Sequence, residues 1–412
     1  MSGSESQESP SICARLVAKG VIVHAPAATV FEGIDPDRVE AGVEIFPGCV
    51  IRGSRTILGA GCKLGHSGGG LYEDVVVGRG AELYGGVFKD AVFLDGVVVR
   101  GNAEMRGGTV MEEGSEVAHH VGLKMTILMP SVVVGSLVNF CDALVAGGTS
   151  REDHTEVGSC LALYNFTPWG DKFASMFGDA VGVFLRSPRI FIGGQTQIVS
   201  PVKVGYGAVI PAGCAVRRSV PAGRMVGETP VRVDQRFDSV LMGGLGPKFD
   251  LTREYVGNLR ALLAWYEQVR APFAQGDALL VAAYEEASRQ IQAGVVERVK
   301  RLDKLAARIP ASMDAHRRAL EGVSYEEDAL IHERRLVEHE SILGRWLGWR
   351  QRMLQGAPPG DPRLLAIGAR MADARRARPD LGYVEAVGAL DDALVEAGSA
   401  ALREIVEVTV AP

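Results

Sequence analysis

Arg106 and Lys124 are two cationic residues eighteen positions apart, and Asp142 follows after another eighteen. In a chain that winds in coils of that length, Arg106 and Lys124 occupy neighbouring strands at a separation of roughly 4.8 Å. Two like charges at that distance repel each other unless an anion binds between them or a carboxylate lies nearby. The spacing therefore predicts an anion-binding pair with Asp142 as its carboxylate neighbour. The alternative interpretation is a ladder of solvated surface charges.

A repeat of six residues predicts coils of this kind. Large apolar residues recur at six-residue intervals, and a small or aliphatic residue stands two positions before each of them. The longest run is Phe93, Val99, Met105, Met111, Val117, Leu123 and Met129, and the phase returns at Ile192, Ile198, Val204, Ile210 and Val216. A period of six fits a parallel β-helix whose short flat sides each bury one side chain, and neither an amphipathic helix nor a hairpin sheet. We expect a mainly β fold, with this β-helix over residues 13–235.

Helical spacing replaces the six-residue repeat from about Gly246. Two apolar stripes at this spacing are Val256, Leu259, Leu263 and Tyr266, and then Leu336, Leu343, Leu347 and Leu354. Ser324 and Glu327 favour a helix start, and Asp361 with Pro362 favours another. The sequence predicts an α-helical C-terminal domain over residues 246–412 with self-contained stripes. Its charged outer faces are expected to be solvated surface, with the docking of a protein partner as the alternative.

Composition excludes several classes of protein. Hydrophobic residues make up 47% and charged residues 23%, and no apolar run is long enough to span a bilayer. The net charge of -6 argues against a nucleic-acid-binding surface. Residues 1–12 are mostly polar and carry no signal sequence, which predicts a disordered tail and a cytoplasmic location. Six scattered cysteines indicate neither a disulfide scaffold nor a metal site.

Particular stretches resemble the acetyltransferase half of the bifunctional UDP-N-acetylglucosamine pyrophosphorylase/glucosamine-1-phosphate acetyltransferase family. Residues 14–53 are similar to the start of that acetyltransferase half. Residues 103–124, with the sequence AEMRGGTVMEEGSEVAHHVGLK, align without a gap on its sugar-phosphate-binding stretch. The resemblance implies a left-handed β-helix, a homotrimer, a sugar-phosphate or nucleotide-sugar substrate and acetyl-CoA or another acyl-CoA as co-substrate. Outward aliphatic residues such as Val98 and Val132 are consistent with assembly along the β-helix.

The same resemblance implies roles for individual residues. It places the binding arginine and lysine of the family on Arg106 and Lys124. Residues 158–172, GSCLALYNFTPWGDK, would carry its substrate asparagine and second lysine on Asn165 and Lys172. Residues 190–217 are similar to the coils that accept the CoA arm, with Gly194 and Ala212 as the cofactor-binding positions. These last residues are also ordinary components of hexapeptide coils.

The general base of the family is a histidine, and no histidine aligns with it here. Counting repeats puts Ser136 at that place, and a shift of one repeat puts Asp142 there. His154 lies eighteen residues after Ser136, in the polar run SREDHTE, and would stack beside Ser136 on an unbroken coil. We therefore predict His154 as the catalytic base, oriented by Asp153 or Glu156; the alternative is a solvated loop histidine.

The remaining histidines do not indicate a metal site. His119 and His120 are neighbours in the sequence, so on a strand they would point to opposite faces and would not easily bind one ion. No other set of imidazoles converges at metal-ligand spacing.

Three functions stay open at this stage. The first is an acyltransferase that acts on an amino-sugar phosphate or on a nucleotide sugar such as UDP-N-acetylglucosamine. The second is a non-catalytic protein that binds the same ligand, which the missing histidine favours, and the third is a structural trimer whose helical domain docks a partner. Pyrophosphorylase activity is rejected, because nothing before residue 100 resembles a Gly-rich nucleotide-binding loop.

Overall fold

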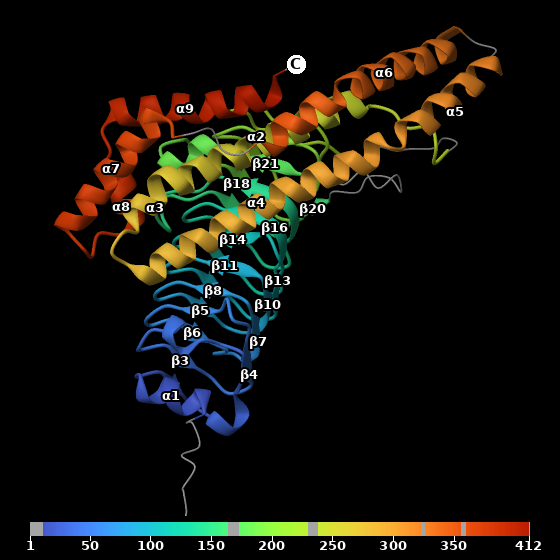
Figure 1. The fold of residues 1–412 in the computed structure, drawn as a ribbon. Helices are drawn as coiled ribbons and strands as arrows, with labels where there is room; N and C mark the ends of the chain where they lie inside the picture. The colour runs from blue at the N-terminus through green and yellow to red at the C-terminus, as the bar shows by residue number, and fades with distance from the viewer. Residues whose placement is uncertain (1–10, 164–172, 230–237, 323–325, 356–359, 412) are drawn as a thin grey trace, which may run out of the picture.

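A stack of parallel β-coils followed by an α-helical domain makes up the protein (Figure 1). The computed structural model describes residues 11–163, 173–229, 238–322, 326–355 and 360–411. Helix α1 (Ile12–Ala18) lies at the first coil and buries Leu16 against the inside of the stack. The predicted fold class is therefore confirmed as a parallel β-solenoid with a C-terminal helical domain. No helix in the described ranges is long and apolar enough to cross a membrane.

The coils have three flat faces, and all strand pairs on them are parallel. The first face is a ten-stranded sheet of β1 (Ile22–Val23), β3 (Glu44–Ile45), β6 (Lys63–Leu64), β9 (Glu82–Leu83), β12 (Val98–Val99), β15 (Glu116–Val117), β17 (Val133–Val134), β19 (Glu156–Val157), β22 (Phe191–Ile192) and β25 (Val209–Ile210). The second face holds β2 (Val30–Glu32), β4 (Cys49–Arg52), β7 (Gly70–Glu73), β10 (Gly86–Lys89), β13 (Ala103–Met105), β20 (Leu161–Leu163), β23 (Gln197–Val199) and β26 (Ala215–Val216). The third face holds β5 (Ile57–Leu58), β8 (Val76–Val77), β11 (Ala91–Phe93), β14 (Thr109–Met111), β21 (Ser175–Phe177) and β24 (Lys203–Val204). Strands β16 (Gly122–Leu128) and β18 (Asn139–Val145) run through the corner between the second and third faces.

The pairing register agrees with the eighteen-residue coil over part of the stack. Val99 pairs with Val117, and Ile192 pairs with Ile210. The coil between β14 and β16 is one residue shorter than eighteen, because Met111 pairs with Leu128. Leu128 therefore points into the coil stack, and the prediction that Met129 does so is wrong. The shortening occurs where β16 passes the corner at Met125, whose φ of 50° turns the strand without a separate loop.

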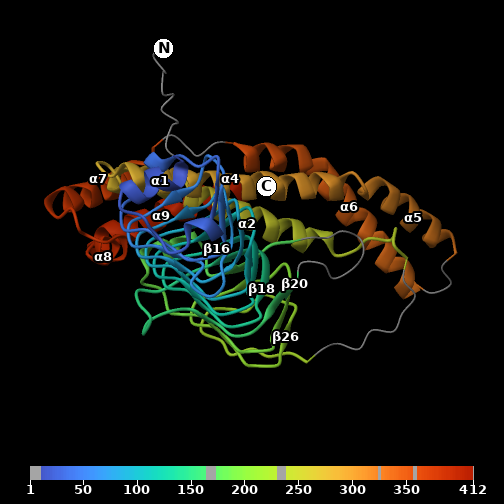
Figure 2. The same cartoon turned by 90° about the horizontal axis from the view of Figure 1, so that it is seen from below.

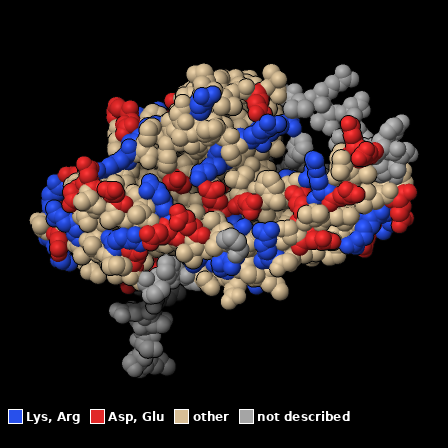
Figure 3. Space-filling model, turned by 90° about the horizontal axis from the view of Figure 1, so that it is seen from above, with Lys and Arg blue, Asp and Glu red and all other residues tan. Residues whose placement is uncertain are grey.

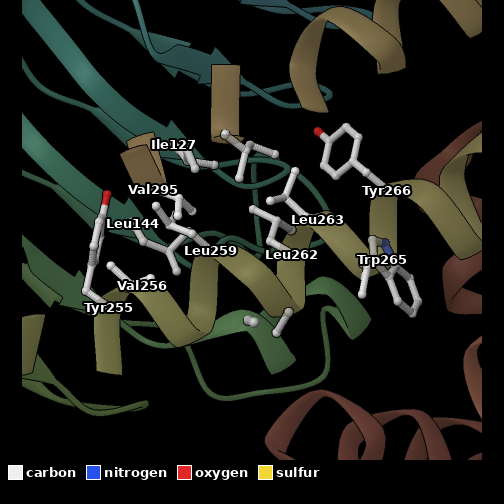
Figure 4. Packing of buried hydrophobic residues seen from close by; sticks show 14 of the residues in the cluster. Ile127, Leu144, Tyr255, Val256, Leu259, Leu262, Leu263, Trp265, Tyr266 and Val295 are labelled. Carbon is white, nitrogen blue, oxygen red and sulfur yellow. The ribbon is translucent and has the colours of Figure 1, made fainter. Parts of the chain in front are cut away.

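Two apolar cores result from this arrangement. One core fills the inside of the coils, where the rings of Tyr72 and Phe88 stack at 5.1 Å. Val132 belongs to this inner core, so the expectation that it points outward is wrong. The other core lies outside the third face, between that face and the helices. In Figure 4, Ile127 and Leu144 of the β-helix lie beside side chains of the helical domain.

The helical domain supplies the other half of this second core. Its helices are α2 (Leu245–Trp265), α3 (Ala271–Phe273), α4 (Ala278–Ala306), α5 (Ile309–Glu321), α6 (Glu326–Leu354), α7 (Pro362–Ala377), α8 (Tyr383–Gly388) and α9 (Asp392–Val410). The view from below shows them along one side of the coils, with α5 and α6 extending beyond the stack (Figure 2). The helical stripes are not self-contained, which corrects that expectation: α2 and α4 bury apolar side chains against the third face.

The two predicted stripes have different outcomes. All four residues of the stripe on α2 and the turn after it are buried. On α6, Leu347 is 78% exposed, and the buried row is instead Ile342, Trp346, Trp349 and Met353. Apolar spacing alone could not separate these two rows, because both recur at helical intervals and only the packing of α6 against the neighbouring helices α2, α4, α5 and α9 selects one of them. Asp361 caps α7 as predicted, whereas Ser324 lies outside the described residues.

A buried arginine joins the two parts of the molecule. Arg270 follows α2 in a π-helical turn and is 0% exposed. Its guanidinium donates to Glu113 at 2.6 Å and to Glu112 at 2.8 Å, and both carboxylates come from the turn after β14. The ring of Tyr383 lies 3.5 Å from the guanidinium carbon. Burial raises the pKa of Glu112, so the charged pair exists only because each partner neutralises the other.

We expect Arg270→Ala to lower the free energy of unfolding by roughly 3–5 kcal/mol, because it leaves two carboxylates buried without a counter-charge. Arg376→Ala is the matched control. Arg376 pairs with Asp373 on the surface, where such a pair contributes about 1 kcal/mol or less. Urea unfolding of both variants measures the difference. Equal losses would show that Arg270 does not join the helices to the coils.

Helices α5 and α6 enclose a histidine cluster with a pH dependence of its own. The rings of His316 and His339 lie 5.5 Å apart, and Glu338 and Arg335 are the charged neighbours of both. Burial lowers the pKa of His339 from 6.5 to about 4. The unfolded chain therefore takes up a proton before the folded one does. The stability contributed by neutral His339 is complete above pH 6.5 and is lost as the pH falls toward 4.

This sign predicts that α5 and α6 open more readily as the pH falls from 6.5 to 4. Hydrogen exchange of the intact protein, corrected for intrinsic rates, should show faster exchange in these two helices over that range. In His339→Leu the extra opening should disappear, since leucine keeps the apolar packing and cannot bind a proton. The same acceleration in both proteins would rule out His339 as its cause.

Candidate functional site

A column of charged side chains runs along the outer edge of the second face. The strand register pairs Arg52 with Glu73 and Glu73 with Lys89. Phe88, Met105 and Leu123 pair in turn on neighbouring strands. The residues that follow them, Lys89, Arg106 and Lys124, therefore lie in one line. The Arg106 amide donates to the Leu123 carbonyl at 2.9 Å, which fixes the two cations on adjacent strands. Stacking of Arg106 and Lys124 is therefore as predicted.

Negative charge offsets one end of this column more than the other. Glu73 accepts from Arg52 at 2.8 Å and lies 3.2 Å from Lys89. Arg106 lies 3.6 Å from Glu104 and is 45% exposed, and Lys124 has no ion-pair partner within the described part of the chain. Positive charge is thus least compensated at Arg106 and Lys124. An incoming anion at this point meets a planar fork and a mobile ammonium group.

Asp142 does not stack on Lys124, because the shortened coil pairs Lys124 with Cys141. With a φ of 62°, Asp142 turns away at the corner, becomes buried, and lies 2.6 Å from Arg298 of α4. Burial raises the pKa of Asp142, while Arg298, Arg301 and Lys124 favour its charged form. The spacing argument is therefore wrong for this residue. Its carboxylate connects the edge of the second face to the helical domain.

Small side chains form a second column at the corner between the first and second faces. The first-face residues from Val98 to Val209 pair in turn on neighbouring strands, and the residues three positions after them lie in one line. These are Gly101, His119, Ser136, Ser159, Gly194 and Ala212, of which only His119 is large. Backbone hydrogen bonds follow the same order, from the Leu137 amide to the His119 carbonyl at 3.1 Å and from the Gly213 amide to the Gly194 carbonyl at 2.9 Å. Gly194 and Ala212, the predicted cofactor positions, are therefore in line with Ser136.

His154 occupies the remaining corner, between the third and first faces. Val133 pairs with Glu156, a step of 23 residues, so Ser159 and not His154 stacks on Ser136. The five additional residues form the polar turn that the sequence shows. The side chain of His154 is 15% exposed, with its Nε2 3.3 Å from Arg151 and 3.8 Å from Glu156. The predicted site residues thus fall at three different corners of one chain.

Asp153 does not orient His154. Its carboxylate accepts from Arg189 at 2.8 Å and from Thr149 at 2.6 Å. The hydrogen bond with Arg189, and after it the hydrogen bond with Thr149, lowers the pKa of Asp153 to about 2. Glu156 is the carboxylate nearer to the imidazole, as the alternative expectation has it. Asn165 and Lys172 lie outside the described residues.

Two neighbouring histidines were underestimated from the sequence. His119 and His120 lie in a turn, not on a strand, and both are exposed. Their Nδ1 atoms are 2.9 Å apart, so the rings do not point to opposite faces as expected. The φ of 59° at His120 makes this possible. The sequence shows the pair, but not the turn that brings the two rings together. No cluster of metal ligands occurs in the described ranges.

Comparisons with known proteins find a relative for half of the chain. No protein-family model matches the chain. The bifunctional protein GlmU of Carboxydothermus hydrogenoformans is 29% identical over 216 residues, which make up 50% of this chain and 44% of that protein. The chain therefore spans less than half the length of this relative. It is a distant homologue of GlmU over half its own length, consistent with a hexapeptide-repeat acetyltransferase-like region.

The burial of Asp142 predicts a structural cost for its removal. Asp142→Asn keeps the shape and tolerates the positive φ, but it leaves Arg298 without its buried counter-charge. We expect a loss of roughly 3–5 kcal/mol in the free energy of unfolding. Lys124→Gln, one coil away and half-buried, should change it by less than about 1 kcal/mol. A stable Asp142→Asn variant in chemical denaturation would contradict this assignment.

Proposed function

We propose that the second face binds the phosphate of an amino-sugar phosphate or of a nucleotide sugar such as UDP-N-acetylglucosamine, and that the protein transfers an acyl group to the sugar amine. The observation that carries the proposal is the pair Arg106 and Lys124 on adjacent strands, where the positive charge of the column is least compensated. Distant homology to GlmU over half the chain supports the proposal. Lys172 and Asn165 would complete the substrate site.

Acetyl-CoA, or another acyl-CoA, is the donor that we propose. A column of small residues at one corner leaves room for an extended arm, and Gly194 and Ala212 belong to that column. The Cβ that would replace a hydrogen of Gly194 meets nothing nearer than the Ser159 nitrogen at 3.9 Å. A side chain as large as that of serine would therefore fit at position 194 without a clash. The space is therefore on the outer side of the corner, where a ligand can lie.

His154 is the base expected from the sequence, and its corner restricts how it can act. Within one chain it lies a full face away from the corner that carries Ser136. To act on a substrate at the second face, it would have to come from a neighbouring copy of the chain, in the homotrimer that we also propose, and this leaves the second face of a single chain without an assigned base. The second candidate function is a binding protein without catalysis, and the serine at the place of the family's histidine favours it.

A structural role with a charged docking surface has less support. On the face of the helical domain seen in Figure 3, basic and acidic side chains are interspersed. A surface with mixed signs does not select a partner of one charge. The charges there fit a solvated surface, as the sequence indicates.

Replacement of Arg106 or Lys124 by alanine tests the phosphate site. Each variant should bind glucosamine-1-phosphate and UDP-N-acetylglucosamine more weakly by roughly 1.5–3 kcal/mol in calorimetry, the contribution of a charge-assisted hydrogen bond. Arg52→Ala is the control, because Arg52 lies in the same column and is already paired with Glu73. Unchanged affinity in both test variants would remove the proposed site.

A further inference from the structure

We propose that His119 accepts the proton from the substrate amine, and that His120 and Asn102 position its ring. This inference rests on the proposed acyl transfer to a phosphosugar. It assigns the reacting end of that substrate to a corner for which the sequence provided no candidate.

The position of His119 in its coil is the first argument. Strand β15 ends at Val117, the turn contains His119, and β16 begins at Gly122 on the way to Lys124. His119 and Lys124 therefore lie at opposite margins of the second face in one coil. Five residues of extended chain span at most about 16 Å. Each side chain can reach over the face from its margin, so one phosphosugar is long enough to extend from the imidazole to the ammonium group.

The corner itself changes character at this coil. Toward the N-terminus an aromatic ladder fills it, with ring centroids 4.6–5.2 Å apart and Arg100 placed over the last ring. The ladder is His24, Phe46, His66 and Tyr84. Toward the C-terminus come Ser136, Ser159, Gly194 and Ala212, which leave the corner open. A thin acyl-carrying arm along the open half would meet the side chain of His119 before it reaches Gly101 and the aromatic ladder.

A chain of polar contacts leads from Asn102 through His120 to His119. The amide nitrogen of Asn102 lies 3.4 Å from Nε2 of His120, and Nδ1 of His120 lies 2.9 Å from Nδ1 of His119. A half-turn of the Asn102 amide brings its oxygen to His120, where it accepts the proton on Nε2 of His120. His119 then donates from its own Nδ1 to His120, and its Nε2 carries the free lone pair. His119 Nε2 has no hydrogen-bond partner among the described residues.

The reaction step balances with this one base. The sugar amine nitrogen attacks the carbonyl carbon of the thioester and forms the new carbon–nitrogen bond. Nε2 of His119 takes the proton that the nitrogen loses. The carbon–sulfur bond then breaks, and the proton passes from the imidazolium to the departing thiolate. The products are an N-acylated sugar phosphate and free coenzyme A.

The test compares His119→Gln with His154→Gln in the intact protein, with glucosamine-1-phosphate and acetyl-CoA as substrates. We expect kcat of His119→Gln to fall by about 100-fold or more, while its affinity for glucosamine-1-phosphate stays unchanged. His154→Gln tests the base that the sequence indicates. Loss of kcat in His154→Gln with none in His119→Gln would assign the base to His154 and overturn the inference.

Asn102 provides a matched pair of variants for the positioning role. Both aspartate and glycine tolerate its φ of 59°. Asn102→Asp supplies a fixed acceptor for His120 and should keep kcat, whereas Asn102→Gly should lower kcat without changing the affinity for the sugar phosphate. A merely structural role would affect the two variants through stability alone, which melting temperatures measure.

Nitrogen-15 spectra of the imidazoles separate failure of this inference from failure of the proposed function. On addition of glucosamine-1-phosphate, the His119 signals should shift and those of His154 should not. Binding that depends on Arg106 and Lys124 but leaves His119 unmoved overturns the inference and keeps the phosphate site. Binding without acyl transfer by the parent protein also overturns it, in favour of a binding protein. Absence of binding removes the proposed function and this inference together.

Discussion

The apolar outer side of the third face is the constraint on which the rest of the structure depends. A coil of hexapeptides buries one side chain per strand inside, yet on this face Val92, Val110 and Ile127 are apolar outside as well. Water cannot solvate such a strip at low cost, so the helical domain has to cover it. The burial of apolar side chains does not by itself fix the orientation of the helical domain, because the hydrophobic effect is not directional. The buried contacts of Arg270 with Glu112 and Glu113 supply the specific orientation that apolar packing lacks.

Covering one face decides where a ligand can bind. With the third face occupied by α2 and α4, the first and second faces and their common corner remain for substrates or for other copies of the chain. The charged column and the small-residue column are the two margins of the second face. Strands β16 and β18 carry that face continuously around to the helices, and Asp142 with Arg298 closes the connection. Lys124 pairs with Cys141, which is next to Asp142. A change in how α4 packs would therefore change the position of Lys124 through Asp142.

Much of the fold could be predicted from short-range pattern. The six-residue repeat gave inward positions such as Phe93 and Val117 correctly, because each coil repeats the same local choice of one buried side chain per flat side. It also placed Arg106 beside Lys124. The repeat failed at Met129, Asp142 and His154, where coils are one residue shorter or five residues longer than eighteen. Counting in steps of eighteen across such a coil therefore assigns the wrong partner, as it does for Asp142 and His154.

The sequence by itself determined which segments coil, which form helices, and which cations share a strand edge, since these follow from periods of a few residues. Only the tertiary structure decided that Leu347 is exposed while Trp349 is buried, that Asp142 faces a helix, and that His119 and His120 meet in a turn. The physical reason is that these outcomes depend on contacts between segments far apart in the chain and on single corner residues with positive φ. Neither leaves a periodic trace in the amino-acid sequence.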